Sequence, residues 1–304
     1  MVETGWFASL WRRMAERLGF TVMGLPGDWR SPVRAEAVAE ALAADREHGI
    51  RAVAVVHNET STGVASDIAA LRRSIDATGH PALLLVDTIS SLASMDYRHD
   101  EWGVDVTVGG SQKGLMLPPG LSFNALSPKA IAASEASRSP RSFWAWGEML
   151  KANRNGFFPY TPSTNLLQGL KVALDLLAAE GLDAVFARHR RAAAATRACV
   201  AAWGLELQCA DPAAFSSSLT AVRMPEGRSA DALRADILAR SDMSLGNGLG
   251  PLNDRVFRIG HLGDFGDLQL IGTLGGVEMG LRAAGIPHRA GGVQAAMDYL
   301  GGNA

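Results

Sequence analysis

Lysine is scarce in this chain of 304 residues, in which almost every basic side chain is an arginine. The lysines are Lys113, Lys129, Lys151 and Lys171. The net charge at neutral pH is −2, which gives no electrostatic reason to expect a nucleic-acid partner. Because lysines are so few, a lysine in a distinctive motif is easier to single out as a functional residue.

Cysteines and long apolar runs are also sparse. Cys199 and Cys209 are too few for a disulfide framework, and both lie in apolar contexts that predict buried, reduced thiols. No sustained apolar run precedes Arg12 and Arg13, so neither a signal peptide nor a membrane-spanning helix is predicted. We therefore expect a cytoplasmic protein. The seven histidines show no metal-ligand spacing, so no metal site is predicted.

Apolar runs of strand length alternate with helical segments in the first half of the chain. Strands are expected at 51–57, 82–86 and 104–108, and helices at 34–47 and 67–77. The uninterrupted apolar character of 82–86 predicts a strand that is buried on both faces. This alternation is typical of an α/β fold with a mainly parallel sheet and flanking helices.

A further strand is expected at 21–25. The pattern changes after Gly181, because the last third of the chain, which includes an expected strand at 205–209, is predicted to form a compact α+β unit. We therefore predict a large domain at 1–180 and a smaller C-terminal domain at 181–304.

Two of the expected strands end in residues that can carry chemistry. Asp87 follows the strand 82–86, and Lys113 follows the strand 104–108 after Gly109 and Gly110. Ligands of open α/β sheets bind outside the carboxyl ends of the strands. Pyridoxal phosphate needs a lysine amine and an acid that keeps its pyridine nitrogen protonated. Either residue alone is as well explained by an exposed loop, but the pair together predicts a pyridoxal phosphate site.

Two other residues allow a functional or a structural interpretation. Thr60 lies in the polar loop after the strand 51–57, where it could contact a ligand or simply form the turn. Arg258 lies on the apolar face of an expected strand at 255–259. Its planar fork suits a substrate carboxylate, and a structural ion pair explains it equally well.

Three segments carry a family resemblance. They are HNETSTGV at 57–64, LLLVDTISSLASMDYRHDEWGVDVTVGGSQKGLMLPPG at 83–120, and GFFPYTPSTNLL at 156–167. These segments resemble class V aminotransferases, and within that family the serine–glyoxylate aminotransferase group. The resemblance implies a pyridoxal-phosphate-dependent transferase fold of type I. It also implies amino-group transfer between an amino acid, L-serine, and a 2-oxo acid, glyoxylate.

The same resemblance implies roles for individual residues around the cofactor. Lys113 would bond covalently to pyridoxal phosphate, and Asp87 would pair with its pyridine nitrogen. Thr60 would contact the phenolic oxygen, and Gln112 would contact the phosphate.

The resemblance further implies what lies on either side of the ring and beyond it. Phe7, rather than Trp6, would stack on one face of the ring, and Ile89 would pack on the other. Thr161 would reach into the site of a neighbouring subunit, which implies a homodimer. Arg258 would bind the substrate carboxylate.

One part of the family pattern is not found in this sequence. Relatives have a segment before the position of Glu3 that holds a glycine-rich substrate loop and a helix N-terminus for the cofactor phosphate. Helix N-termini bind anions through free N–H groups and the helix dipole, so we expect a weaker phosphate site and a partly uncovered sheet. The alternatives to an active aminotransferase are an impaired chain acting as a dimer partner and a related class V lyase.

Overall fold

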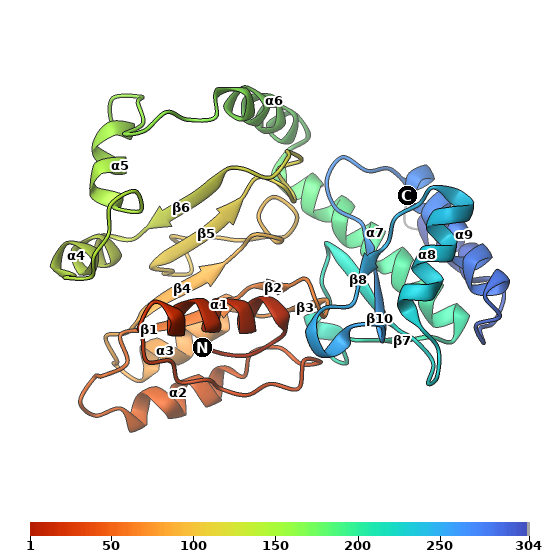
Figure 1. The fold of residues 1–304 in the computed structure, drawn as a ribbon, viewed down its shortest axis with the longest axis horizontal. Coiled ribbons are helices and arrows are strands. Elements are labelled where there is room, and N and C mark those ends of the chain that lie inside the picture. Colours follow the sequence, from red (N-terminus) through yellow and green to blue (C-terminus); the bar gives the residue numbers. More distant parts are fainter. Residues whose placement is uncertain (303–304) are drawn as a thin grey trace.

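The computed structural model describes residues 1–302 and contains two four-stranded sheets joined by one long helix, α7 (Leu182–Trp203) (Figure 1). The first sheet has the strand order β1-β4-β5-β6. Its strands are β1 (Ala52–Val56), β4 (Leu83–Asp87), β5 (Val106–Gly110) and β6 (Ser122–Leu126). The first three are parallel neighbours, and β6 is an antiparallel edge strand. The predicted α/β class with a mainly parallel sheet is therefore confirmed.

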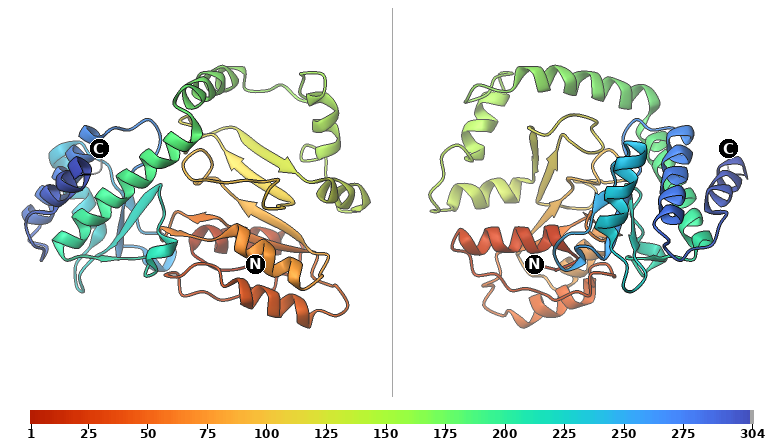
Figure 2. Two further views of the ribbon diagram at one scale, coloured as in Figure 1. Left: turned by 180° about the vertical axis from the view of Figure 1, so that it is seen from behind. Right: turned by 45° about the vertical axis from the view of Figure 1, so that its right-hand side comes forward.

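Helices cover the first sheet unevenly. The flanking helices are α1 (Trp6–Arg17), α2 (Ala35–Ala44) and α3 (Ile68–Ala77). Apolar side chains of α2 and α3 form one core with β1 and β4, while α1 lies over β1 on the opposite face (Figure 2). The helices that follow β6 form an arc beyond the sheet edge in both figures; they are α4 (Pro128–Ala136), α5 (Trp146–Asn153) and α6 (Thr164–Glu180).

One face of this sheet is more open than the apolar run 82–86 predicted, although a partly uncovered sheet was expected from the family resemblance. In β4, Leu84 and Val86 are buried against α2 and α3, whereas Leu83 and Leu85 are half-buried. The prediction that 82–86 is buried on both faces is therefore wrong. An apolar run makes burial favourable, but a covering layer has to be supplied by other elements.

Two predicted strands are also shorter than expected. Within 21–25, only Leu25 pairs, in an isolated bridge to Val2. Of 205–209, only β7 (Glu206–Leu207) joins a sheet. Single backbone contacts continue on either side, because the N–H of Gln208 donates to Ala221 O at 2.9 Å and the N-terminal ammonium of Met1 donates to Met23 O at 2.7 Å. A strand needs a regular ladder of such bonds, and these contacts do not extend into one.

The second sheet has the order β7-β8-β10-β9. Its other strands are β8 (Leu219–Arg223), β9 (Gly246–Asn247) and β10 (Val256–Gly260). Its helices are α7, α8 (Ala230–Ser241), α9 (Asp267–Ala283) and α10 (Gly292–Gly302), with short 3-10 turns η1 (Pro212–Ala214) and η2 (Gly250–Leu252). Trp203 and Phe257 are the largest fully buried side chains of its core. No helix in residues 1–302 is long and apolar enough to cross a membrane.

Candidate active site

The carboxyl ends of three parallel strands meet at the edge of the first sheet that faces the second (Figure 1). Val56 pairs with Asp87, and Asp87 pairs with Val108. The ladder continues past the strands, because the N–H of His57 donates to Asp87 O (3.0 Å) and the N–H of Thr88 donates to Val108 O (2.8 Å). The residues that follow the three strands are therefore held close together.

Asp87 has one oxygen engaged and one available. Its Oδ1 accepts the N–H of Ile89 at 2.8 Å, and within residues 1–302 no group donates to Oδ2. Burial raises the pKa of Asp87 to about 6, since the carboxylate loses solvation that one hydrogen bond does not replace. A cationic N–H donor beside Oδ2 would restore the ionised form, which is the partner that a protonated pyridine nitrogen provides.

Lys113 is half-buried and forms no ion pair with any carboxylate of the described chain. Desolvation, and then the positive charge of Arg258, lower the pKa of its amine. A lowered pKa increases the neutral fraction of the amine, which is the form that attacks an aldehyde.

Two glycines allow the loop after β5, which carries Lys113, to lie close to the loop after β4. A Cβ on Gly110 would lie 2.8 Å from Ile89 Cδ1 and 2.9 Å from Gln112 Oε1, and a Cβ on Gly114 would overlap Leu92 O. The glycines therefore allow Ile89 and Gln112 to close on the backbone beside Lys113.

Arg258 reaches from β10 across to the loop after β1. Its Nε donates to Asn247 O at 2.8 Å, and its Nη1 donates to Thr60 O at 2.9 Å. The structural ion pair considered from the sequence is wrong, because no carboxylate of residues 1–302 lies within ion-pair distance of Arg258. Within residues 1–302 no acceptor is bonded to Nη2, and burial, followed by the charge of Arg234, lowers the pKa of the guanidinium.

Phe7 is held at the site through its backbone. Its N–H donates to Glu59 Oε1 at 3.3 Å, and that of Ala8 donates to Glu59 Oε2 at 3.1 Å. Glu59 is not among the site residues predicted from the sequence. Two signals could have found it: it is the one charged residue between His57 and Gly63, and α1 has no capping side chain of its own at Gly5.

Thr161 is the one predicted site residue that the fold does not bring to the others. It is exposed in the loop between α5 and α6, which lies on the outer arc of the molecule, apart from α1 and β2 (Asn58–Glu59) (Figures 1 and 2).

The grouped residues suit pyridoxal phosphate. Asp87 provides an open, partly buried carboxylate, Lys113 an unpaired amine, and Arg258 an unpaired guanidinium edge. Among the described residues no cluster of histidine, cysteine or acidic side chains could hold a metal ion. The chemistry available here is that of an amine, an acid and a carboxylate-binding cation.

Known proteins resemble the whole chain. Residues 1–248 match the family model described as aminotransferase class-V. The serine–glyoxylate aminotransferase of Hyphomicrobium methylovorum is 47% identical, over 100% of this chain and 76% of its own length. The L-aspartate–glyoxylate aminotransferase of Paracoccus denitrificans is 46% identical, over 98% and 75%. A crystal structure of pyridoxamine–pyruvate aminotransferase from Mesorhizobium loti superposes with a TM-score of 0.92 at 32% identity, covering 100% of this chain and 78% of that one.

Sequence, fold and site lead to the same family. The relatives align across the strand ends that carry Asp87 and Lys113. The structural neighbours superpose over 99 to 100% of this chain, and so over both of its sheets. The chain belongs to the class V aminotransferases, which are pyridoxal-phosphate-dependent enzymes of fold type I.

Proposed function

We propose that this chain transfers the amino group of L-serine to glyoxylate. The observation that carries the proposal is that Asp87 and Lys113 follow neighbouring parallel strands of the first sheet, while Arg258 of β10 reaches across to Thr60 after β1. Four relatives that are 45 to 47% identical to this chain are named as glyoxylate aminotransferases, and three of these names give serine as the donor.

Six residues of this chain would hold the cofactor. Lys113 would form the covalent bond, Asp87 would accept the pyridine N–H through Oδ2, and Thr60 would contact the phenolic oxygen. Gln112 would bind the phosphate, and Ile89 would pack on the ring opposite Phe7. The contacts of Ile89 and Gln112 with the backbone at Gly110 support this grouping. When bound, pyridoxal phosphate withdraws electrons from the α-carbon of the amino acid and so makes the α-proton acidic.

Three side chains of this chain would then bind the substrate carboxylate, accept the α-proton and keep the ring nitrogen protonated. The free Nη2 edge of Arg258 would bind the carboxylate of either the amino acid or the oxo acid. Lys113 Nζ would take the α-proton, and its lowered pKa increases the fraction of neutral amine that can accept it. Asp87 would keep the proton on the ring nitrogen as long as the carboxylate is ionised.

The cysteines argue against a cysteine desulfurase, which is one form of the class V lyase alternative. Cys199 and Cys209 are both buried in the second half of the chain, and burial raises the pKa of both thiols. A desulfurase needs an accessible thiolate as the nucleophile. A NifS-like protein superposes with a TM-score of 0.71 at 13% identity, a likeness that extends to the fold alone.

Cofactor titration tests the assignment of Lys113. Purified protein given pyridoxal phosphate is expected to develop a visible absorption band and to transfer an amino group from L-serine to glyoxylate. Lys113→Ala should abolish the band and lower kcat at least about a thousandfold, since both the covalent bond and the base are removed. Lys171→Ala is the matched control, because Lys171 is an exposed lysine paired with Asp175. A wild-type protein without band or turnover would instead support the impaired dimer partner.

The substrate assignment has its own test. Arg258→Ala should keep the cofactor band and raise the KM for both substrates about a hundredfold, because a charge-assisted contact to the carboxylate is lost. Parallel assays with L-aspartate separate the two donors named among the relatives. Faster turnover with L-aspartate would overturn L-serine as the donor and leave the aminotransferase assignment intact.

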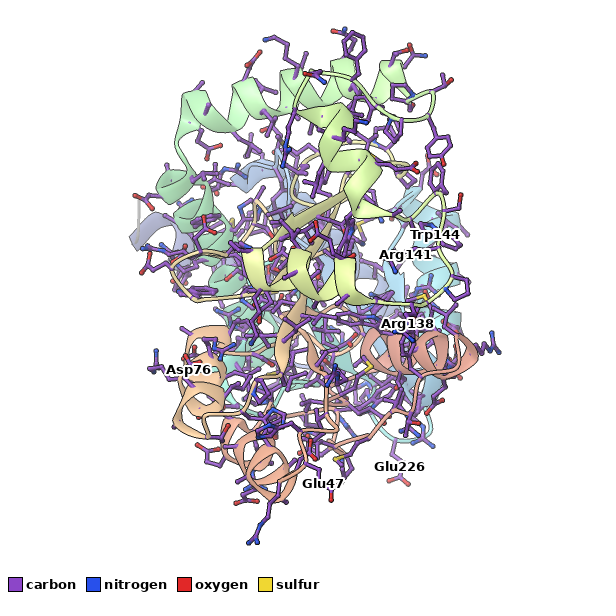
Figure 3. The ribbon with its side chains drawn as sticks, turned by 90° about the vertical axis from the view of Figure 1, so that its left-hand side faces the viewer. Glu47, Asp76, Arg138, Arg141, Trp144 and Glu226 are labelled. Atoms are coloured by element: carbon purple, nitrogen blue, oxygen red, sulfur yellow. The ribbon has the colours of Figure 1, made fainter. Side chains whose placement is uncertain are left out.

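We further propose a homodimer in which Thr161 contributes to the partner's phosphate site. Large aromatic side chains are exposed in the segments before and after α5, and they are Phe143, Trp144, Phe157, Phe158 and Tyr160. The rings of Phe143 and Tyr160 lie 4.9 Å apart, so the two segments form one surface. Figure 3 shows Arg138, Arg141 and Trp144 along the same edge of the molecule. Exposed aromatic surfaces with arginine are typical of subunit interfaces.

The division into domains 1–180 and 181–304 is part of the proposal as well. Gly181, at φ 84°, separates α6 from α7, and the two sheets have separate core clusters. A cytoplasmic location is proposed from the two unpaired cysteines, which suit a reducing compartment.

A further inference from the structure

Glu59 is an acid with no exposed surface, placed in β2 directly after β1. Its carboxylate accepts hydrogen bonds from the N–H groups of Phe7 and Ala8 and from both the N–H (3.1 Å) and the hydroxyl (2.7 Å) of Ser61. Burial raises its pKa, and these hydrogen bonds oppose that rise. A fully buried carboxylate is costly, so its retention here calls for a role that an apolar side chain could not fill.

Helix α1 depends on this carboxylate because it lacks a cap. Its N-cap is Gly5, which has no side chain to accept a hydrogen bond, and no acidic residue stands in the first turn. The N–H of Trp6 instead donates to Ser61 Oγ at 2.9 Å, and those of Phe7 and Ala8 donate to Glu59. The first turn of α1 is thus capped entirely by residues more than fifty positions away in the sequence.

The contact between α1 and β2 is a close one. A Cβ on Gly5 would overlap both Glu59 Cγ and Ser61 Oγ. The start of the helix therefore rests directly on the carboxylate, and the position of Phe7 is set by Glu59.

Asn58, the other residue of β2, forms hydrogen bonds with the loop after β4. Asn58 Nδ2 donates to Ser90 Oγ at 2.8 Å, and Ser90 Oγ donates back to Asn58 O at 2.8 Å. Ser90 follows Ile89, the residue expected on the ring face opposite Phe7. The two residues of β2 therefore hold both residues expected to flank the cofactor ring. Glu59 holds Phe7, and Asn58 holds Ile89 through Ser90.

We propose that Glu59 is a positioning residue that fixes Phe7 relative to Ile89 and so sets the width of the slot for the cofactor ring. The inference rests on the proposed roles of Phe7 and Ile89. Contacts between a ring and its neighbours lose a quarter to a half of their strength over a gap of about 0.5–1 Å, so a small shift of α1 weakens binding. Glu59 itself touches neither cofactor nor substrate in this proposal.

The test is Glu59→Gln in the full chain. The amide keeps one accepting oxygen but places its NH2 donor against the other backbone N–H group, so the first turn of α1 should shift. The Kd for pyridoxal phosphate, measured by titrating the cofactor-free protein, is expected to rise about tenfold. The visible circular dichroism per bound cofactor should fall, because the ring is held less asymmetrically.

Asp105→Asn is the matched control. Asp105 is also buried, at 4% exposed, and its carboxylate also accepts a backbone N–H (Leu84, 2.8 Å) and a hydroxyl (Ser127, 2.8 Å). It precedes β5, at the end of the sheet opposite to Asp87. This variant should lose stability and keep the wild-type Kd and circular dichroism.

Glu59→Gln with wild-type Kd and circular dichroism would overturn the inference while leaving the proposed function standing. If Glu59→Gln does not fold, Ser61→Ala removes one donor to Glu59 and the acceptor for Trp6, and about a threefold rise in Kd is expected. An unchanged Kd in Ser61→Ala would then overturn it. A wild-type protein that binds no pyridoxal phosphate overturns the proposed function and the inference together.

Discussion

Asp87 illustrates a conflict between charge and burial at a single residue. Its pKa is raised from 3.8 to about 6, mainly by desolvation, with a further contribution from the charge of Glu59. Between these two values the folded chain holds a proton that the unfolded chain has released. The contribution of Asp87 to the stability of the cofactor-free protein therefore falls as the pH rises from about 4 to about 6.

Asp87→Asn is expected to remove this dependence. Above pH 6 the cofactor-free variant should be more stable than the wild type by about 2 kcal/mol, and at pH 4 the two should converge. Urea unfolding at several pH values between 4 and 8 measures the difference. The same variant should bind pyridoxal phosphate more weakly, because the ring nitrogen loses its anionic partner. Equal stabilities of the wild type and Asp87→Asn at pH 8 would show that burial of the Asp87 carboxylate does not destabilise the folded chain.

At the scale of elements, the loop between β5 and β6 is shaped by backbone contact rather than by side chains. The position of a Cβ on Gly114 would overlap Leu92 O and lie 2.8 Å from Ala93 C. Neither contact can be relieved by turning a side chain, because both atoms belong to the backbone of the loop after β4. The loop that carries Lys113 is thereby held against the loop that follows Asp87 by the packing of one backbone on another.

Gly114→Ala should destabilise the chain by about 2–3 kcal/mol and reduce the fraction of Lys113 that binds cofactor. Thermal unfolding and the visible absorption band report the two effects. Gly272→Ala is the control: Gly272 lies in α9 with open space around it, so alanine should stabilise that helix by about 0.5–1 kcal/mol. A Gly114→Ala variant as stable as the wild type would mean that the two loops can separate without loss.

At the scale of the whole molecule, the first sheet and the arc of α4 to α6 present surfaces that the described chain leaves uncovered. Leu83 and Leu85 are half-buried, and Trp144 is 80% exposed. Thr161 belongs to the same outer arc, far from the residues with which it is expected to act. The proposed second copy of the chain would cover the exposed aromatic surface and would give Thr161 a site to act on.

Trp144→Glu is expected to shift the protein from dimer to monomer in analytical ultracentrifugation, since a charge would be buried without a partner. Cofactor affinity should fall with it if Thr161 acts across the interface. Leu268→Glu, at a residue that is 86% exposed on α9, should leave the assembly unchanged. A wild-type protein that sediments as a monomer at micromolar concentration would contradict the dimer.

The sequence by itself determined the α/β class and the strand ends that carry Asp87 and Lys113. Both follow from local patterns, because a short apolar run predicts a strand and the residue after it lies at the sheet edge. The tertiary structure alone decided the partners of Arg258 and Glu59. Arg258 meets Thr60 across 198 residues, and Glu59 caps a helix 51 residues away. Such pairings depend on how separate elements pack, and local sequence carries no record of that packing.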